Sequence, residues 1–188
     1  MPNNKMIIFC APSGSGKTTI AKKMMELFPI LFPSISATSR PPRTNEIDGI
    51  DYHFVSIEEF KKKINQGEFI EWEEVYENIF YGTLNSEISR LQDLGKIPLF
   101  DIDVKGAVSL KKIYGNLALV IFIKVPLDLL RERLISRNTE TKEDFEKRIN
   151  RVKEEMKFEG FADKVVVNIN LQEAINECQK IISDFLKI

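Results

Sequence analysis

The residues with the clearest chemical potential form a glycine-rich segment near the start of the chain. They follow an apolar run at positions 6–10 and read Ala11, Pro12, Ser13, Gly14, Ser15, Gly16, Lys17 and Thr18. Glycines let consecutive backbone N–H groups converge on a phosphate chain, the lysine adds a positive charge, and the threonine hydroxyl can ligate Mg²⁺. The segment predicts a phosphate-binding loop. An ordinary glycine-rich turn beside a surface lysine is the alternative.

A second group of side chains could bind another phosphate. Arg40 and Arg43 stand in a stretch rich in hydroxyls and prolines, and Tyr52 and Tyr81 can support them. Arginine pairs bind phosphate bidentately, and tyrosine hydroxyls can donate to the remaining oxygens. Two phosphate sites in one small protein suggest transfer from a nucleotide to a second phosphorylated molecule. Surface arginines in weak ion pairs are the alternative for either one alone.

Two carboxylates end another apolar run. Asp101 and Asp103 are two residues apart at the carboxyl end of a predicted strand at 97–103, so their side chains should leave the same face. In a parallel sheet, ligands bind beyond the carboxyl ends of the strands, where Lys17 would also lie. Asp101 could hold Mg²⁺ with Thr18, directly or through water. Two solvated aspartates are the alternative.

A third basic set lies on a pair of interrupted helices. Arg133 and Arg137 are at i,i+4 and share a helix face, and Arg148 follows on the next helix. With a mobile break between the helices, the set resembles a lid that brings positive charge to a transferring phosphoryl group. A solvated helix face is the alternative.

The elements that must position these residues alternate between strands and helices. Apolar strand-like runs at 6–10, 97–103, 119–123 and 165–167 are each followed by apolar residues at helical spacing. This order predicts an α/β fold with a central parallel sheet covered by helices on both faces. One stretch breaks the order and predicts an inserted mixed α/β subdomain. The expected division is a core at 1–33, 96–126 and 158–188, an insertion at 34–95 and a helical lid at 127–157.

The composition limits the classes of partner. Among 188 residues, 27 Lys and Arg stand against 28 Asp and Glu, so the net charge of −1 does not favour nucleic acid or a membrane surface. The longest apolar runs are too short for a membrane span, and no signal-peptide pattern is found. Cys10 and Cys178 are expected as small core residues of a cytoplasmic protein, a monomer or small homo-oligomer that binds small molecules.

The chain resembles the guanylate kinases, a family of nucleoside monophosphate kinases with a P-loop. The resemblance covers nearly the whole chain. Besides the glycine-rich loop, the stretches that carry it are 36–43, 49–54, 69–72, 81–83, 101–106, 137–141 and 167–168.

The resemblance implies an ATP:GMP phosphotransferase that uses Mg²⁺ with ATP and forms GDP and ADP, with dGMP as a second acceptor. It implies that the acceptor phosphate is held by Arg40, Arg43, Tyr52 and Tyr81. Guanine would be read by Ser36, Glu71, Thr83 and Asp103. The lid would supply Arg133, Arg137 and Arg148, and Asn168 would lie near the adenine of ATP.

The chain departs from the family pattern at a few positions. Ala11 replaces the first glycine of the loop, which is compatible with the loop if its φ stays negative. Ser39 stands where a second threonine is usual, and Thr83 where serine is usual. Residues 169–170, Ile and Asn, replace positions that are often acidic.

The guanine assignment that the resemblance implies also makes physical sense from elementary chemistry. Guanine offers two adjacent donors and a carbonyl, and a glutamate such as Glu71 can accept from both donors. Adenine places a lone pair at one of these positions, and such a mismatch can be rejected by about 10⁴–10⁵. A solvated strand residue beside Trp72 is the alternative. No general base is needed, because a phosphomonoester with a pKa of about 6 is mostly deprotonated near neutral pH.

Two other functions remain open from the sequence. A kinase of the same fold could act on another phosphorylated sugar or nucleotide. A guanylate-kinase-like domain without activity could instead bind proteins, but this interpretation expects a damaged loop or missing arginines. Lys17, Thr18, Arg40 and Arg43 are all present, which favours the enzyme.

Overall fold

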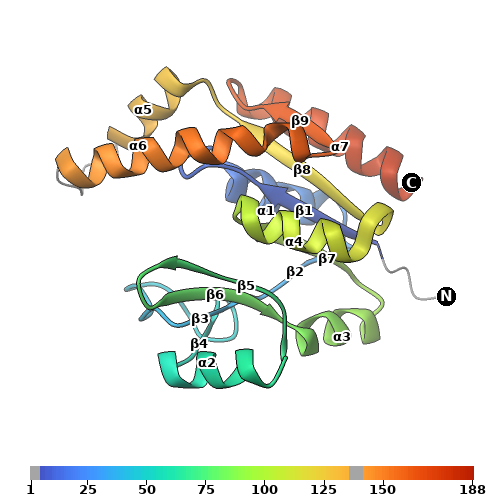
Figure 1. Ribbon diagram of the computed structural model, residues 1–188. Coiled ribbons are helices and arrows are strands. Elements are labelled where there is room, and N and C mark those ends of the chain that lie inside the picture. The colour runs from blue at the N-terminus through green and yellow to red at the C-terminus, as the bar shows by residue number, and fades with distance from the viewer. Residues whose placement is uncertain (1–4, 136–141) are drawn as a thin grey trace.

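The computed structural model describes residues 5–135 and 142–188 and has a parallel sheet at its centre (Figure 1). Every pair of neighbouring strands in this sheet is parallel, in the order β2-β7-β1-β8-β9. This confirms the predicted fold class. The strands are β1 (Met6–Cys10), β2 (Leu31–Pro33), β7 (Ile97–Ile102), β8 (Ala118–Lys124) and β9 (Lys164–Val167).

Helices cover both faces of the central sheet. Alternate residues of β1 enter different cores, as the two-residue period of a strand requires: Ile7 and Phe9 face α1 and α7, whereas Ile8 faces α3 and α4. The cysteines Cys10 and Cys178 are both buried, as expected, and burial raises the pKa of each thiol to about 12. The covering helices are α1 (Lys17–Leu27), α3 (Asn85–Asp93), α4 (Val104–Tyr114) and α7 (Leu171–Leu186).

A second, mixed sheet lies beside the first, as the sequence predicted (Figure 1). Its helix α2 (Ile57–Asn65) begins after Ser56, whose hydroxyl accepts from the backbone N–H of Glu59. The Phe60 ring of α2 stacks on Phe69 with 4.4 Å between ring centroids, which fixes the helix on the sheet. The boundaries 34–95 stay a prediction. The strands, in the order β4-β3-β6-β5, are β3 (Ala37–Thr38), β4 (His53–Phe54), β5 (Phe69–Tyr76) and β6 (Ile79–Leu84).

Helices α5 (Leu127–Ile135) and α6 (Lys142–Met156) pack together around a small core of their own (Figure 1). Short 3₁₀ turns, Gly115–Leu117 and Lys157–Phe161, precede β8 and β9. The predicted residue Arg137 and the 137–141 stretch lie outside the described residues. No helix in the described ranges is both long and apolar enough to cross a membrane.

One expected strand ends earlier than its sequence suggested. The apolar run at 97–103 was predicted to carry Asp101 and Asp103 on one strand face, but β7 stops at Ile102. Asp103 is instead the N-cap of α4, and its Oδ1 accepts from the backbone N–H of Gly106 at 2.9 Å. A capping aspartate satisfies a helix N–H that would otherwise lack a partner. The two carboxylates therefore belong to different local environments.

Candidate active site

The glycine-rich loop connects β1 to α1 and has the backbone that a phosphate-binding loop needs. Gly14 and Gly16 have φ values of 87° and 83°, which favour glycine. Ala11 is not among the residues with positive φ, so the condition set for this substitution is met. The backbone N–H groups at the start of α1 follow directly, with the positive end of the helix dipole.

The loop and the end of β7 meet at a cluster of three side chains. Lys17 Nζ forms an ion pair with Asp101 and donates to the carbonyl of Ile102 at 2.7 Å. Thr18 Oγ1 donates to Asp101 Oδ2 at 2.6 Å. Burial alone would raise the pKa of Asp101, but Lys17 and Thr18 outweigh it, so the pKa is lowered and the carboxylate is ionised. The structure thus brings together the three residues predicted for phosphate and metal.

Asn168 lies beneath the loop. Its Nδ2 donates to the carbonyl of Ser15 at 2.7 Å, and the residue is only 2% exposed. A Cβ at Gly16 would lie 2.6 Å from this Nδ2, so the contact depends on glycine at that position. The side-chain amide therefore supports the loop backbone. The position near the adenine of ATP that the resemblance implies for Asn168 stays a prediction.

The two described arginines of the predicted lid both reach this region. Arg148 Nη2 donates to Ser13 Oγ at 2.6 Å, which joins α6 to the loop. Arg133 Nη2 donates to the carbonyl of Asn168 at 3.1 Å, which joins α5 to the residue that supports the loop. These contacts place both arginines at the phosphate-binding side of the sheet rather than on a solvated helix face.

The predicted acceptor-phosphate residues form a second cluster. Arg40 Nε donates to the Tyr81 hydroxyl at 2.9 Å, and its guanidinium carbon lies 5.0 Å from the centroid of the Tyr52 ring. Burial raises the pKa of Tyr52, and the nearby Tyr81 and Asp101 raise it further. Because the charge of Asp101 acts on Tyr52, this cluster lies within electrostatic range of the glycine-loop cluster.

Glu46, which sequence reasoning missed, holds Arg40 and Arg43 together. Its oxygens accept from Arg40 Nη1 and Nη2, each at 2.6 Å, and from the backbone N–H of Arg43 at 2.8 Å. Mainly through Arg40, the pKa of Glu46 falls to about 2. The sequence signal that could have pointed to Glu46 is a single glutamate that closely follows two arginines in a loop restricted by prolines.

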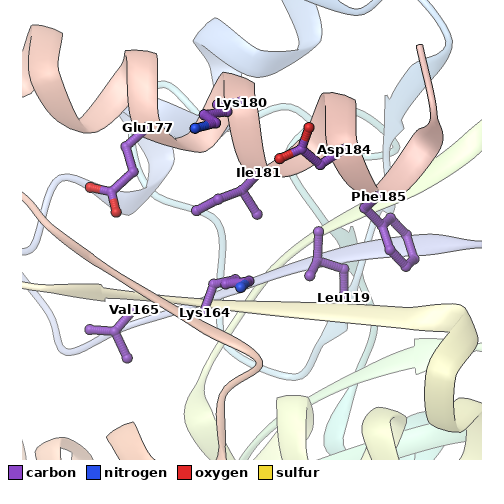
Figure 2. Close-up of a pocket in the computed structure, with 8 residues that line it drawn as sticks. All are labelled: Leu119, Lys164, Val165, Glu177, Lys180, Ile181, Asp184 and Phe185. Atoms are coloured by element: carbon purple, nitrogen blue, oxygen red, sulfur yellow. The ribbon is translucent and has the colours of Figure 1, made fainter.

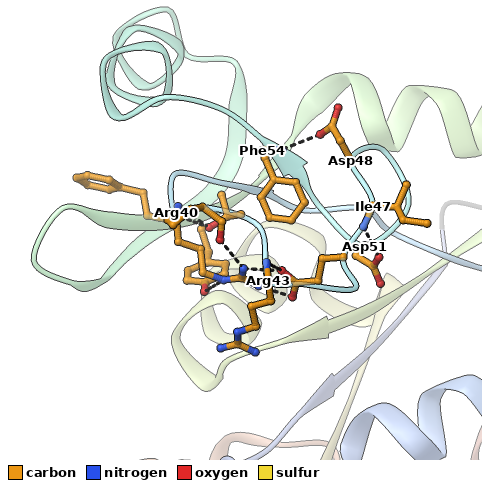
Figure 3. Close-up of polar contacts among 11 residues, drawn as sticks. Arg40, Arg43, Ile47, Asp48, Asp51 and Phe54 are labelled. Atoms are coloured by element: carbon orange, nitrogen blue, oxygen red, sulfur yellow. Dashed lines mark hydrogen bonds and ion pairs between the residues drawn. The ribbon is translucent and has the colours of Figure 1, made fainter.

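Arg40 and Arg43 consequently differ in how many of their guanidinium N–H donors are already engaged in hydrogen bonds. Hydrogen bonds to Tyr81, to the carbonyl of Pro41 and twice to Glu46 engage four of the five N–H donors of Arg40. The Arg43 guanidinium extends out of the loop in Figure 3 and makes no hydrogen bond within the described ranges. Arg43 therefore offers the larger number of donors to an incoming phosphate.

The predicted base-reading residues centre on a buried carboxylate. Glu71 on β5 is 8% exposed, and its Oε1 accepts from Thr83 Oγ1 on β6 at 2.6 Å. Burial raises the pKa of Glu71 to about 7, partly offset by the Thr83 hydrogen bond and reinforced by the charge of Asp103. Ser36 lies just before β3, where its carbonyl accepts from the His53 N–H at 2.9 Å. Glu71 is not a solvated strand residue.

Two further charged residues, which sequence reasoning also missed, join this carboxylate region to α6. Arg151 Nη2 lies 3.8 Å from Asp103 Oδ2, and Arg151 Nε donates to Glu155 Oε1 at 2.7 Å. Glu155 is 9% exposed, and burial raises its pKa. In the sequence of a highly charged helix, Arg151 and Glu155 resemble solvent-exposed residues. Only the packing of α6 in the structure shows that they belong to this region.

A pocket of about 580 Å³ lies elsewhere, between α7 and the β8–β9 edge of the sheet (Figure 2). It is lined by apolar residues such as Leu119 and by charged ones of both signs such as Lys164 and Asp184. Leu119 and Lys164 lie at the amino-terminal ends of their strands. The pocket is therefore on the opposite edge of the sheet from the glycine-rich loop, where this fold binds ligands.

Comparison with known proteins gives one consistent family. The sequence model described as "Guanylate kinase" matches residues 3–185. The guanylate kinase of Salinibacter ruber is 46% identical over 187 residues, which cover 99% of both chains. The guanylate kinase of Bacteroides fragilis is 46% identical over 98% of this chain and 91% of its own.

Solved structures agree with the sequence relatives. The crystal structure of guanylate kinase from Anaplasma phagocytophilum superposes with a TM-score of 0.77, at 28% identity, over 96% of this chain and 85% of that chain. TT1252 from Thermus thermophilus is 16% identical with a TM-score of 0.54 over 97% of this chain and 98% of that chain, and supports the fold alone. Matches in family, sequence and structure over nearly the whole length show that the chain belongs to the guanylate kinase family.

Proposed function

We propose that this protein transfers the γ-phosphoryl group of ATP to GMP, and to dGMP, releasing GDP or dGDP and ADP. The observation that carries the proposal is the buried Glu71 carboxylate, which accepts a hydrogen bond from Thr83 at 2.6 Å in a chain that also has the glycine-rich loop. Two guanine donors match a carboxylate, whereas the lone pair of adenine opposes it.

The phosphate groups would be held from two sides. Lys17 and the backbone N–H groups of the loop would bind the phosphates of ATP, while Arg43, Arg40 and the two tyrosines would hold the phosphate of GMP. Arg133 from α5 and Arg148 from α6 would act as a lid when both nucleotides are bound. Arg137, which lies outside the described residues, would act with them. Catalysis then consists of alignment and charge neutralisation, because the acceptor oxygen is already deprotonated.

Mg²⁺ fits this site as a companion of ATP. The Thr18 hydroxyl and the Asp101 carboxylate are hard oxygen donors already 2.6 Å apart, the ligand type that Mg²⁺ prefers. In the described ranges no group of three or more His, Cys, Asp or Glu residues could hold a metal. We therefore assign Mg²⁺ to Thr18, to Asp101 directly or through water, and to the phosphates, whose negative charge it neutralises.

An assay of ADP release tests the proposed function. ATP and Mg²⁺ are mixed in turn with GMP, dGMP, AMP, UMP and ribose phosphates, each with and without a chelator. Rapid turnover of GMP and dGMP alone is expected. A preference for another acceptor would favour a kinase of different substrate, and no turnover with any acceptor would favour a binding domain.

We also propose a cytoplasmic enzyme that acts on small molecules as a monomer or small homo-oligomer. The near-neutral net charge supports the absence of nucleic-acid and membrane partners. Light scattering at assay concentration measures the assembly directly. Binding to anionic vesicles or to duplex DNA at physiological salt would contradict the assignment of partners.

The unequal contacts of the two phosphate arginines lead to a prediction. Arg43→Ala should raise KM for GMP by at least about tenfold, since a charge-assisted contact contributes about 1.5–3 kcal/mol, with little change in unfolding temperature. Arg40→Ala should raise KM as well, and it should also lower the unfolding temperature by at least about 2 °C because Glu46 loses its bidentate partner. Steady-state kinetics and thermal melts check both. Equal loss of stability in the two variants would contradict it.

The raised pKa of Glu71 predicts a pH dependence of GMP use. Below about pH 7 the carboxyl carries a proton and can no longer accept from both guanine donors, so kcat/KM for GMP should fall as the pH drops. The limiting slope is about tenfold per pH unit for one essential ionised group. A profile from pH 5.5 to 8.5 at saturating ATP measures it. In Glu71→Gln the fall in kcat/KM that comes from protonation of Glu71 should be lost, and only the fall that comes from protonation of the GMP phosphate, at about pH 6, should remain.

A further inference from the structure

The Glu71 carboxylate lies against the first turn of α4, where the two sheets of the molecule meet. Its Oε1 is held by Thr83 of β6 at 2.6 Å. Its Oε2 faces Gly106, and a Cβ built on that glycine would lie only 2.9 Å from this oxygen. The carboxylate is therefore confined between a hydroxyl on one side and a residue without a side chain on the other.

The backbone does not require glycine at position 106. Gly106 lies within α4 and is not among the glycines with positive φ. Its backbone N–H donates a hydrogen bond to Asp103 Oδ1, and any residue other than proline could donate the same bond. Alanine is the better helix former, so local preference opposes glycine here. Free space for the Glu71 oxygen is the property that glycine alone supplies.

We propose that Gly106 is a positioning residue for base selection, because its missing side chain leaves the space that Glu71 Oε2 occupies. The inference rests on the proposed guanine-reading role of Glu71. A methyl group at this position forces the carboxylate to rotate away from α4 and breaks its alignment with the Thr83 hydroxyl. The same Cβ would make a tight contact of 3.3 Å with Ile102 Cδ1 and an ordinary contact of 3.5 Å with Asp103 Oδ1, so the Glu71 oxygen is the atom that must move.

The first test replaces the glycine itself. Gly106→Ala should lower kcat/KM for GMP by about 10²-fold, the cost of misplacing a contact by about 1 Å. The loss should appear as a higher KM for GMP and a smaller preference over AMP, with KM for ATP unchanged. The pH at which kcat/KM for GMP falls, which is assigned to protonation of Glu71, should also shift. Gly160→Ala is the matched control, because Gly160 has no positive φ and its Cβ would meet nothing within 4 Å.

A double-mutant cycle separates positioning from general damage. In a Glu71→Ala background there is no carboxylate to displace, so adding Gly106→Ala should change kcat/KM for GMP by less than about twofold. If Gly106→Ala alone does not fold, the double variant should fold, since the crowded oxygen is gone. Wild-type kinetics in Gly106→Ala, an equal loss in both backgrounds, or a double variant that stays unfolded would overturn the inference. The proposed role of Glu71 is judged separately, by whether Glu71→Ala alone retains GMP selectivity.

Discussion

Lys17→Met is expected to lower kcat for GMP phosphorylation by about 10²–10³-fold, the usual cost of losing one donor that stabilises transition-state charge. Lys17 is the only cation among residues 11–18, and the structure holds its Nζ beside Asp101 and the Ile102 carbonyl at the end of β7. Charge builds on the transferring group at this position in the proposed reaction. Methionine keeps the length and apolar stem of the side chain but removes the charge, so the loss should fall on kcat.

The control for this experiment lies on the same helix. Lys23→Met removes a lysine that only pairs with Glu26 on the exposed side of α1, and it should retain wild-type kinetics. Single-turnover measurements at saturating ATP and GMP separate the chemical step from binding. A kcat for Lys17→Met within threefold of wild type, in a variant that melts normally, would remove Lys17 from the catalytic groups.

The fold was predictable because its signals are local. Residues 6–10 form a bounded apolar run and became β1, and residues 69–76 became β5 between turn signals. Ser56 and Asn170 cap their helices with side-chain oxygens, as these residue types commonly do. The end of β7 was misjudged, because alternation cannot show where ladder hydrogen bonds stop and Asp103 begins to cap a helix instead.

The contacts that escaped prediction follow no sequence period. The hydrogen bond from Asn168 to Ser15 spans 153 positions, and Glu46 reaches Arg40 across six positions of an irregular loop. Arg151 and Glu155 lie on a helix whose sequence reads as solvated. Family resemblance predicted which residues contact substrate, whereas the residues that hold these side chains in place required coordinates.

Glu71→Gln is expected to reduce the preference for GMP over AMP by at least about 10²-fold from a discrimination of about 10⁴–10⁵. Glutamine offers one acceptor and one donor, which matches the lone pair and amino group of adenine rather than the two donors of guanine. GMP efficiency should therefore fall while AMP efficiency rises. Competition between the two nucleotides, followed by separation of GDP and ADP labelled from the acceptor, measures the ratio directly.

The same substitution should stabilise the protein without substrate, which distinguishes a selectivity residue from a structural one. Because burial raises the Glu71 pKa to about 7, the folded state binds a proton more tightly than the unfolded state, so stability falls as pH rises from about 4.5 to 7. At about 1.4 kcal/mol per pKa unit, ionising Glu71 costs up to about 3 kcal/mol at pH 8. Glutamine avoids this cost, and the unfolding temperature at pH 8 should rise by about 2–4 °C per kcal/mol.

Glu74→Gln on the same strand is the control. Glu74 is an exposed side chain that accepts from the backbone N–H of Asn78, and its replacement should change neither the preference for GMP nor the unfolding temperature. A Glu71→Gln variant that is less stable at pH 8 yet keeps its preference for GMP would show that the carboxylate serves the fold and not the base.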